Sequence, residues 1–179
     1  MSAGSARSLR PTLLVAAGVV VLDLLTKHWA INRLSDGRDI DLIGSLRFHL
    51  TFNSGMAFSR GQGLGPIIGI VAVVVVVVLL RSLRREGSLL LDVATGLVIG
   101  GALGNVLDRV FRGDGLMDGS VIDFIDVQWW PIFNVADMAV TIGGILLVVS
   151  TLLLGRHPTP RPDEPVEAPD SSPPVSPGP

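Results

Sequence analysis

The chain has 179 residues, of which 48% are hydrophobic and 17% are charged, with a mean hydropathy of +0.56 and a formal net charge of −2. This composition is too apolar for an ordinary soluble domain of this length, and it argues against nucleic-acid binding. The sequence contains no cysteine, which excludes disulfides, zinc–thiolate sites and a cysteine nucleophile.

Four apolar runs approach the roughly 20 helical residues that cross a bilayer core of about 30 Å. They lie at residues 12–31, 64–80, 89–107 and 133–154. The first follows Arg7 and Arg10, as in a signal peptide, but no small-residue cleavage site follows it, so we expect a retained anchor helix. The valine-rich segment 71–78 has strand propensity in water, yet a lone strand in lipid would leave its backbone unpaired, and we therefore expect a helix.

Four spans place both chain termini on one side of the membrane. Lysines and arginines number seven on that side and seven on the other, so counting them gives a tie. The densest basic cluster, Arg81–Arg85, lies in the loop between the second and third runs, and it favours cytoplasmic termini.

Two segments outside the runs have their own patterns. Residues 46–52 alternate apolar with polar side chains, which predicts a half-buried strand in a small extramembrane sheet. Residues 155–179 contain nine prolines among 25 residues together with Asp, Glu and Ser, so we expect a disordered tail.

Polar residues gather near span ends or in loops on the side opposite the termini. A charge at the bilayer centre costs about 2.5–3.5 kcal/mol on insertion scales, so each such residue needs a reason to be there. We therefore expect one polar site at one interface. The residues concerned are Asp23, Lys27, Asn53, Asn105, Asp108, Arg109, Asp123, Asn134 and Asp137.

In the first run, Asp23 and Lys27 are spaced i, i+4 and share a helix face. A lysine that snorkels towards the interface with a local ion partner is an alternative account of this pair. Asp23 lies deeper than snorkelling requires.

The third run carries a stripe of small residues that lets another helix approach closely: Gly96, Gly100 and Gly104. After this stripe, Asn105 shares a face with Asp108 and Arg109 at i+3 and i+4. A purely structural network between Asp108 and Arg109 is an alternative account of these side chains, and in either case we expect them to organise the floor of the site.

The fourth run opens with a polar face formed by Asn134, Asp137 and Thr141, and Asp123 lies upstream among apolar neighbours. Fourteen residues separate the two aspartates, and the intervening Trp129-Trp130-Pro131 suits an interfacial turn that doubles back. Two facing carboxyl groups cannot both ionise in a low dielectric, which supplies an acid and a base at one pH. From the residues alone, an aspartic hydrolase and an ion-coupled transporter with buried carboxylates remain equally open, beside non-enzymatic roles.

Five motifs together resemble the lipoprotein signal peptidase (signal peptidase II) family. They are Asp23-Leu-Leu-Thr-Lys27, Asn53-Ser-Gly-Met-Ala-Phe58, Gly100-Gly-Ala-Leu-Gly-Asn-Val-Leu-Asp-Arg109, Val121-Ile-Asp-Phe124 and Phe133-Asn-Val-Ala-Asp137. The resemblance extends from the first run to the fourth, and the third and fifth motifs are the most specific. Ser54 and Met56 stand where the family commonly has threonine and alanine.

The resemblance implies an all-α integral membrane protein with four transmembrane helices, a small extracytoplasmic sheet and a flap. The implied divisions are a cytoplasmic N-terminus (1–11), a peptidase domain (12–154) with its sheet at about 38–60 and flap at about 110–131, and a cytoplasmic tail (155–179). The implied location is the bacterial cytoplasmic membrane, with the active site on the extracytoplasmic side.

The implied activity is an aspartic endopeptidase that removes signal peptides from diacylglyceryl-modified prolipoproteins, cleaving before the lipidated cysteine. Its partners would be these precursors and membrane lipid, without nucleic acid, metal or organic cofactor, and a monomer is expected. An intramembrane aspartic peptidase acting on unlipidated helices is a further alternative.

Carried over residue by residue, the resemblance assigns roles to the polar residues above. The two catalytic aspartates fall on Asp123 and Asp137. The remaining positions match supporting polar residues (Asp108, Arg109), residues that hold the dyad and the peptide backbone (Asn105, Asn134), a mainly structural first-helix pair (Asp23, Lys27) and a substrate-side residue of the sheet (Asn53).

Overall fold

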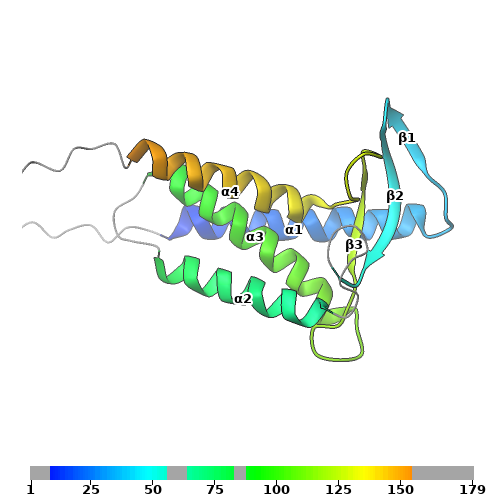
Figure 1. Cartoon of the computed structure of the whole chain (residues 1–179), viewed down its shortest axis with the longest axis horizontal. Helices are drawn as coiled ribbons and strands as arrows, with labels where there is room; N and C mark the ends of the chain where they lie inside the picture. The colour runs from blue at the N-terminus through cyan, green and yellow to red at the C-terminus, as the bar shows by residue number, and fades with distance from the viewer. Residues whose placement is uncertain (1–8, 56–63, 83–87, 155–179) are drawn as a thin grey trace, which may run out of the picture.

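In the computed structural model, which describes residues 9–55, 64–82 and 88–154, four long helices run side by side and a small sheet lies across one end of them (Figure 1). The elements in chain order are α1 (Arg10–Leu34), β1 (Ile40–Ile43), β2 (Leu46–Asn53), α2 (Gly65–Ser82), α3 (Leu89–Phe111), β3 (Val121–Asp126) and α4 (Val135–Leu154). All four helices are long and apolar enough to cross a membrane, as the sequence predicts.

The helix boundaries differ from the predicted runs in ways that affect the site. The valine-rich segment 71–78 is helical within α2, as expected. Helix α3 continues to Phe111 rather than stopping near residue 107, so Asp108 lies within its last turn and not beyond it. Helix α4 begins at Val135 because Phe133 pairs with Ile125 of β3 instead of joining the helix.

Helix α3 lies at the centre of the bundle. In an 18-residue apolar stretch of each helix, 61% of the residues are buried in α3, against 17–22% in the other three helices. Its predicted small-residue stripe contacts α1: a Cβ on Gly96 would lie 2.7 Å from the carbonyl oxygen of Thr12. A second contact, which the sequence analysis did not anticipate, joins α3 to α4. There a Cβ on Gly143 would lie 2.8 Å from the carbonyl oxygen of Ala94. Backbone contact on two sides explains why α3 is the most buried helix.

We expect Gly100→Ala to lower the free energy of unfolding by about 1–3 kcal/mol, because its Cβ would lie 2.7 Å from the carbonyl oxygen of Ala16 and would push α1 away. The matched control is Gly18→Ala on α1, where a Cβ would meet nothing within 4 Å. Thermal unfolding in detergent measures both variants. Equal melting temperatures for the two would contradict the account of α1–α3 packing.

The sheet is antiparallel throughout, with strand order β1-β2-β3. Strand β2 confirms the prediction for residues 46–52. The third strand was not predicted, and it lies within the range 110–131 expected to form a flap. Four of its first five side chains are buried, so it lacks the alternation that marks a half-buried strand.

The sheet packs on the end of α1 through an apolar cluster. Ala30, Leu34, Ile122 and Phe124 are almost completely buried in it. The ring of Phe48 lies 5.0 Å from that of Trp29. This packing fixes β3, and with it Asp123, over the ends of the helices.

Several sequence expectations fall outside the described residues. They concern residues 1–8 of the N-terminus, the part of the expected sheet at 56–60, most of the basic loop after α2 and the proline-rich segment 155–179.

Candidate active site

Helix α4 starts at a reciprocal hydrogen-bonded cap that fixes Asp137. The Asp137 N–H donates to Oδ1 of Asn134 at 2.9 Å, and the Asn134 N–H donates to Oδ2 of Asp137 at 3.1 Å. This is the arrangement of a capping box, in which two side chains satisfy free backbone donors of the first turn. Asp137 is thereby held at the helix N-terminus.

The chain between β3 and α4 doubles back, as Trp129-Trp130-Pro131 predicts. It leaves the sheet through Gln128, whose φ is 67° and whose N–H donates to Oδ1 of Asp126 at 2.7 Å. It returns at Phe133, whose N–H donates to the carbonyl oxygen of Ile125 at 3.1 Å. This turn brings the start of α4 back to the strand that carries Asp123.

Asp123 is 2% exposed and accepts hydrogen bonds from two amide side chains. Its Oδ1 accepts from Asn134 Nδ2 at 2.7 Å, and its Oδ2 accepts from Asn53 Nδ2 at 3.0 Å. Burial, followed by the nearby carboxyl group of Asp137, raises the pKa of Asp123 from 3.8 to about 7, against the effect of the two amides. Asp123 therefore keeps its proton to a much higher pH than an ordinary aspartate does.

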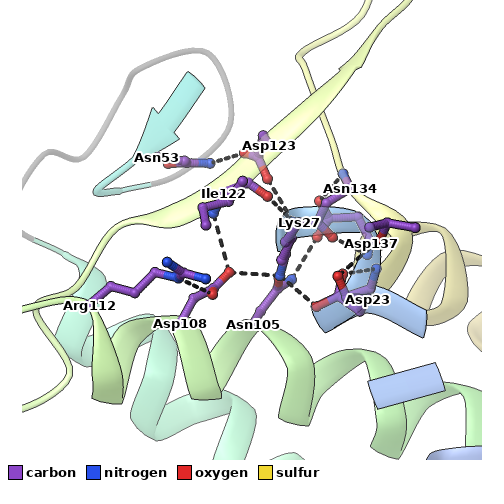
Figure 2. A network of polar contacts seen from close by, with 12 residues as sticks. Asp23, Lys27, Asn53, Asn105, Asp108, Arg112, Ile122, Asp123, Asn134 and Asp137 are labelled. Carbon is purple, nitrogen blue, oxygen red and sulfur yellow. Dashed lines mark hydrogen bonds and ion pairs between the residues drawn. The ribbon is translucent and has the colours of Figure 1, made fainter. Parts of the chain in front are cut away.

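Two amide side chains link the two aspartates (Figure 2). Asn105 donates from Nδ2 to Oδ1 of Asp137 at 2.8 Å. Its Oδ1 accepts from Asn134 Nδ2 at 3.1 Å, and the same Asn134 group reaches Asp123. Since an amide both donates and accepts, these two side chains connect the two acidic groups by hydrogen bonds without adding a charge of their own.

Asp123 and Asp137 line one cavity of about 520 Å³. Around the two carboxyl groups it is polar, with Asn53, Asn105 and Arg109 in its wall. Further along, its walls are formed by apolar side chains of α2, α3 and α4, namely Ile68, Ala72, Val75, Val98, Ala102, Val106 and Val140. The cavity thus combines a polar end beside the sheet with an apolar part between the helices.

Lys27 lies at the centre of a buried ionic network that reaches the amide of Asn105 (Figure 2). Its Nζ lies 2.7 Å from Oδ2 of Asp23 and 2.8 Å from Oδ2 of Asp108, and it donates to Oδ1 of Asn105 at 3.1 Å. Lys27 is 0% exposed, so the snorkelling alternative is wrong. Asp23 in turn accepts from the Ala136 N–H at 3.0 Å, which ties α1 to the first turn of α4.

The alternative of a structural Asp108–Arg109 network is wrong, because the two side chains have different partners. Asp108 pairs with Lys27 and, through Oδ1, with Arg112 Nε at 2.6 Å, and its Oδ2 accepts from the Ile122 N–H of β3 at 3.2 Å. Arg109 lies on the other side of α3, where Nη2 donates to the carbonyl oxygen of Gly55 at 3.1 Å. The sequence analysis missed Arg112, although its i, i+4 spacing from Asp108 is a recognisable signal.

The structure therefore brings eight of the nine predicted polar residues into one connected set of hydrogen bonds and ion pairs, and it places Arg109 in the cavity wall beside them. Within the described ranges, no three His, Asp or Glu side chains come together in a way that could hold a metal ion.

Comparisons with known proteins agree on one group. A family model described as signal peptidase (SPase) II matches residues 15–153. The lipoprotein signal peptidase of Rhodococcus jostii is 47% identical over 146 residues, which cover 80% of this chain and 74% of that protein. The lipoprotein signal peptidase of Mycobacterium avium is 44% identical over 147 residues, which cover 82% of this chain and 81% of that protein. A solved bacterial membrane enzyme aligns with a TM-score of 0.72 at 29% identity, over 84% of this chain and 93% of its own.

Proposed function

The chain belongs to the signal peptidase II family, and on that premise we propose that it removes signal peptides from prolipoproteins with Asp123 and Asp137 as the catalytic pair. The observation that carries this proposal is that both carboxyl groups line one cavity and are linked to each other through Asn134 and Asn105.

The two aspartates have different surroundings, which suits different roles. Asp123 has a raised pKa and acts as the acid. Asp137 lies in the first turn of α4 and accepts from two N–H groups, so positive partial charge surrounds it and it acts as the base. An acid and a base at one site are what peptide hydrolysis requires.

The reaction proceeds in two steps. Asp137 takes a proton from a water molecule as the water oxygen bonds to the scissile carbonyl carbon, while Asp123 gives its proton to the carbonyl oxygen. The resulting tetrahedral intermediate then loses its amine: Asp137 passes its proton to the leaving nitrogen, Asp123 recovers its own, and the C–N bond breaks. Both side chains end in their starting states.

The substrate is a precursor that carries a diacylglyceryl group on the cysteine after the cleaved bond. Apolar cavity walls within the helices suit a membrane-embedded substrate that reaches the dyad sideways from the bilayer. Asn53 and Arg109 lie where they can hold the peptide backbone. The termini face the cytoplasm, the site faces outward, and the protein works as a monomer in the bacterial cytoplasmic membrane.

A transporter is the weaker alternative because, among the described residues, the buried polar groups shared by α1 and α3 fall into two separate sets and not into a continuous path. The network around Lys27 lies at the sheet end of the helices. The buried hydrogen bond from Thr12 to Asp92 lies at the opposite end, at the start of α1 and α3. Between them, the contact of α1 with α3 is apolar, with Ala16, Ile99 and Ala102 in one cluster.

Expression in a bacterium depleted of its own lipoprotein signal peptidase tests the function. We expect lipoprotein precursors to shift to their mature size on gels. The Asp123→Asn variant, at equal abundance in the membrane, should leave them unprocessed. Accumulation of unprocessed precursors with the unaltered chain present in the membrane would refute the proposal.

We expect kcat/KM to fall as the pH rises through about 7, by about tenfold per unit once the proton of the pair is lost. The direction follows from the raised pKa, because the protonated acid exists below that value and disappears above it. The apparent pKa belongs to the pair and not to Asp123 alone. A pH–rate profile in detergent measures this, with circular dichroism at each pH to confirm that the protein stays folded. A flat profile from pH 6 to 9 would exclude the assigned acid.

A further inference from the structure

A second cavity of about 520 Å³ lies against α4 beside the turn that follows β3. Its walls come from that turn and from α4, and they are Val127, Trp129, Trp130, Phe133, Asp137, Met138, Thr141 and Ile142. Its volume is within the roughly 300–1,000 Å³ range of sites that bind small molecules.

The second cavity meets the first at the proposed dyad. Four residues line both of them: Trp130, Phe133, Asp137 and Thr141. The two cavities are therefore adjacent, with Asp137 in the wall of each. A substrate whose scissile bond lies at Asp137 can place a different part of its structure in each cavity.

The chemistry of the two cavities differs. The first has an apolar part between the helices, but its end at the two carboxyl groups offers hydrogen-bonding groups for a peptide backbone, among them Asn53, Asn105 and Arg109. In the second, the described lining is hydrocarbon and aromatic rings except for Asp137, Thr141 and two indole N–H groups. A peptide chain there would leave most of its N–H and C=O groups without partners, at a cost of about 1–3 kcal/mol each, whereas an acyl chain has no such groups.

The second cavity is also placed to receive a molecule from the bilayer. Met138 and Ile142 are 43% and 48% exposed on α4, a helix that can span the membrane. At its sheet end Trp129 is 75% exposed, and tryptophan favours the polar boundary of a bilayer, where its N–H can meet an ester carbonyl. Hydrocarbon walls with an indole at the mouth match the acyl chain and ester of a glycerolipid.

We propose that this second cavity binds an acyl chain of the substrate's diacylglyceryl group, while the first cavity binds the peptide on the other side of Asp137. The inference rests on the proposed function, since it names the part of that substrate that each cavity takes. On this proposal, Met138 and Ile142 determine specificity for lipid-modified precursors. They do so by contacting the acyl chain and take no part in the reaction itself.

A photo-crosslinking experiment tests the position of the acyl chain. The probe is a prolipoprotein whose diacylglyceryl group carries a diazirine in its acyl chain, and it is bound to the Asp123→Asn variant so that it is not cleaved. We expect mass spectrometry to find the label on residues 127–129 and 138–142. Labels on the α2 wall of the first cavity, or spread over the lipid-facing sides of all four helices, would overturn the assignment.

Two tryptophan variants on α4 provide a kinetic test. Ile142→Trp places a larger side chain in the second cavity. It should raise KM about tenfold or more with little change in kcat, because it blocks binding of the substrate's acyl chain in the ground state. Ile145→Trp is the matched control, since Ile145 is 58% exposed on the same helix and lines neither cavity. Equal KM values for the two variants would refute the inference.

The failure of this inference is distinguishable from failure of the proposed function. If the unaltered protein cleaves the diazirine precursor but the label lies elsewhere, the lipid assignment alone is wrong. If the unaltered protein does not cleave the precursor at all, the proposed function is wrong and the lipid assignment falls with it.

Discussion

Asp123→Asn and Asp137→Asn should each reduce kcat by about 10²–10⁴-fold, the usual contribution of a positioned acid or base. Asparagine has nearly the same shape as aspartate and keeps one of the two oxygens that accept hydrogen bonds at each position, so one of the two hydrogen bonds of each side chain survives. The variants should therefore fold normally while losing the group that exchanges protons. Initial rates on a lipidated precursor in detergent measure the loss.

Two features distinguish the loss of a catalytic pair from general damage. The double variant should be about as inactive as either single variant, because residues that act as a unit are not additive. Asp41→Asn, an exposed carboxylate on β1 of the same sheet, should keep a rate close to that of the unaltered protein. A rate near normal in either dyad variant would remove that residue from the mechanism.

Lys27→Met should lower the free energy of unfolding by about 3–5 kcal/mol, because it leaves two buried carboxylates without their shared cation. Those carboxylates are Asp23 on α1 and Asp108 on α3, both 2% exposed or less. The variant should also lose activity, because the Lys27 ammonium holds Asn105, which contacts Asp137. Denaturant titration in detergent measures the stability change.

The matched control for Lys27 is Arg38→Met. Arg38 pairs with Asp36 in a solvent-exposed ion pair, and such pairs contribute about 0–1 kcal/mol. Adding Asp23→Asn to Lys27→Met should recover part of the lost stability, because it removes the carboxylate whose cation is lost, whereas Asp108 keeps its ion pair with Arg112. If Lys27→Met and Arg38→Met were equally stable, the buried network would not have the structural role given to it here.

The sequence contained enough information to predict the four helices and the placement of Asp123 and Asp137 at one cavity. Apolar runs of membrane length define the helices whatever their neighbours are. The two aspartates could be paired because a short segment with two interfacial tryptophans separates them, and the structure returns through that turn to pair Phe133 with Ile125.

Other features depend on tertiary contacts that no local pattern reveals. Strand β3 is covered on both faces, so its sequence does not alternate. Asp108 and Arg109 are neighbours in sequence, but the packing of α3 between other helices turns Asp108 towards Lys27 and Arg109 towards Gly55. Which partner each side chain meets is set by helix orientation, and a single sequence does not encode that locally.

The hydrogen bonds of Asn134 and Asn105 explain why amide side chains lie between the two carboxyl groups. Asn134 caps α4, donates to Asp123 and reaches Asn105, so one side chain couples the start of the helix to both aspartates. Because its Nδ2 is a donor, it supports either protonation state of Asp123 without itself titrating. Lys27, one step further away, orients Asn105.

The most direct measurement is a paired digest by the purified protein in detergent, using two copies of one precursor that differ by the diacylglyceryl group on the cysteine. Mass spectrometry of the products identifies the cut. We predict that the lipidated precursor is cleaved before its modified cysteine while the unlipidated one stays intact. Equal cleavage of both, or of neither, would contradict a peptidase whose site is built for a lipid-bearing substrate.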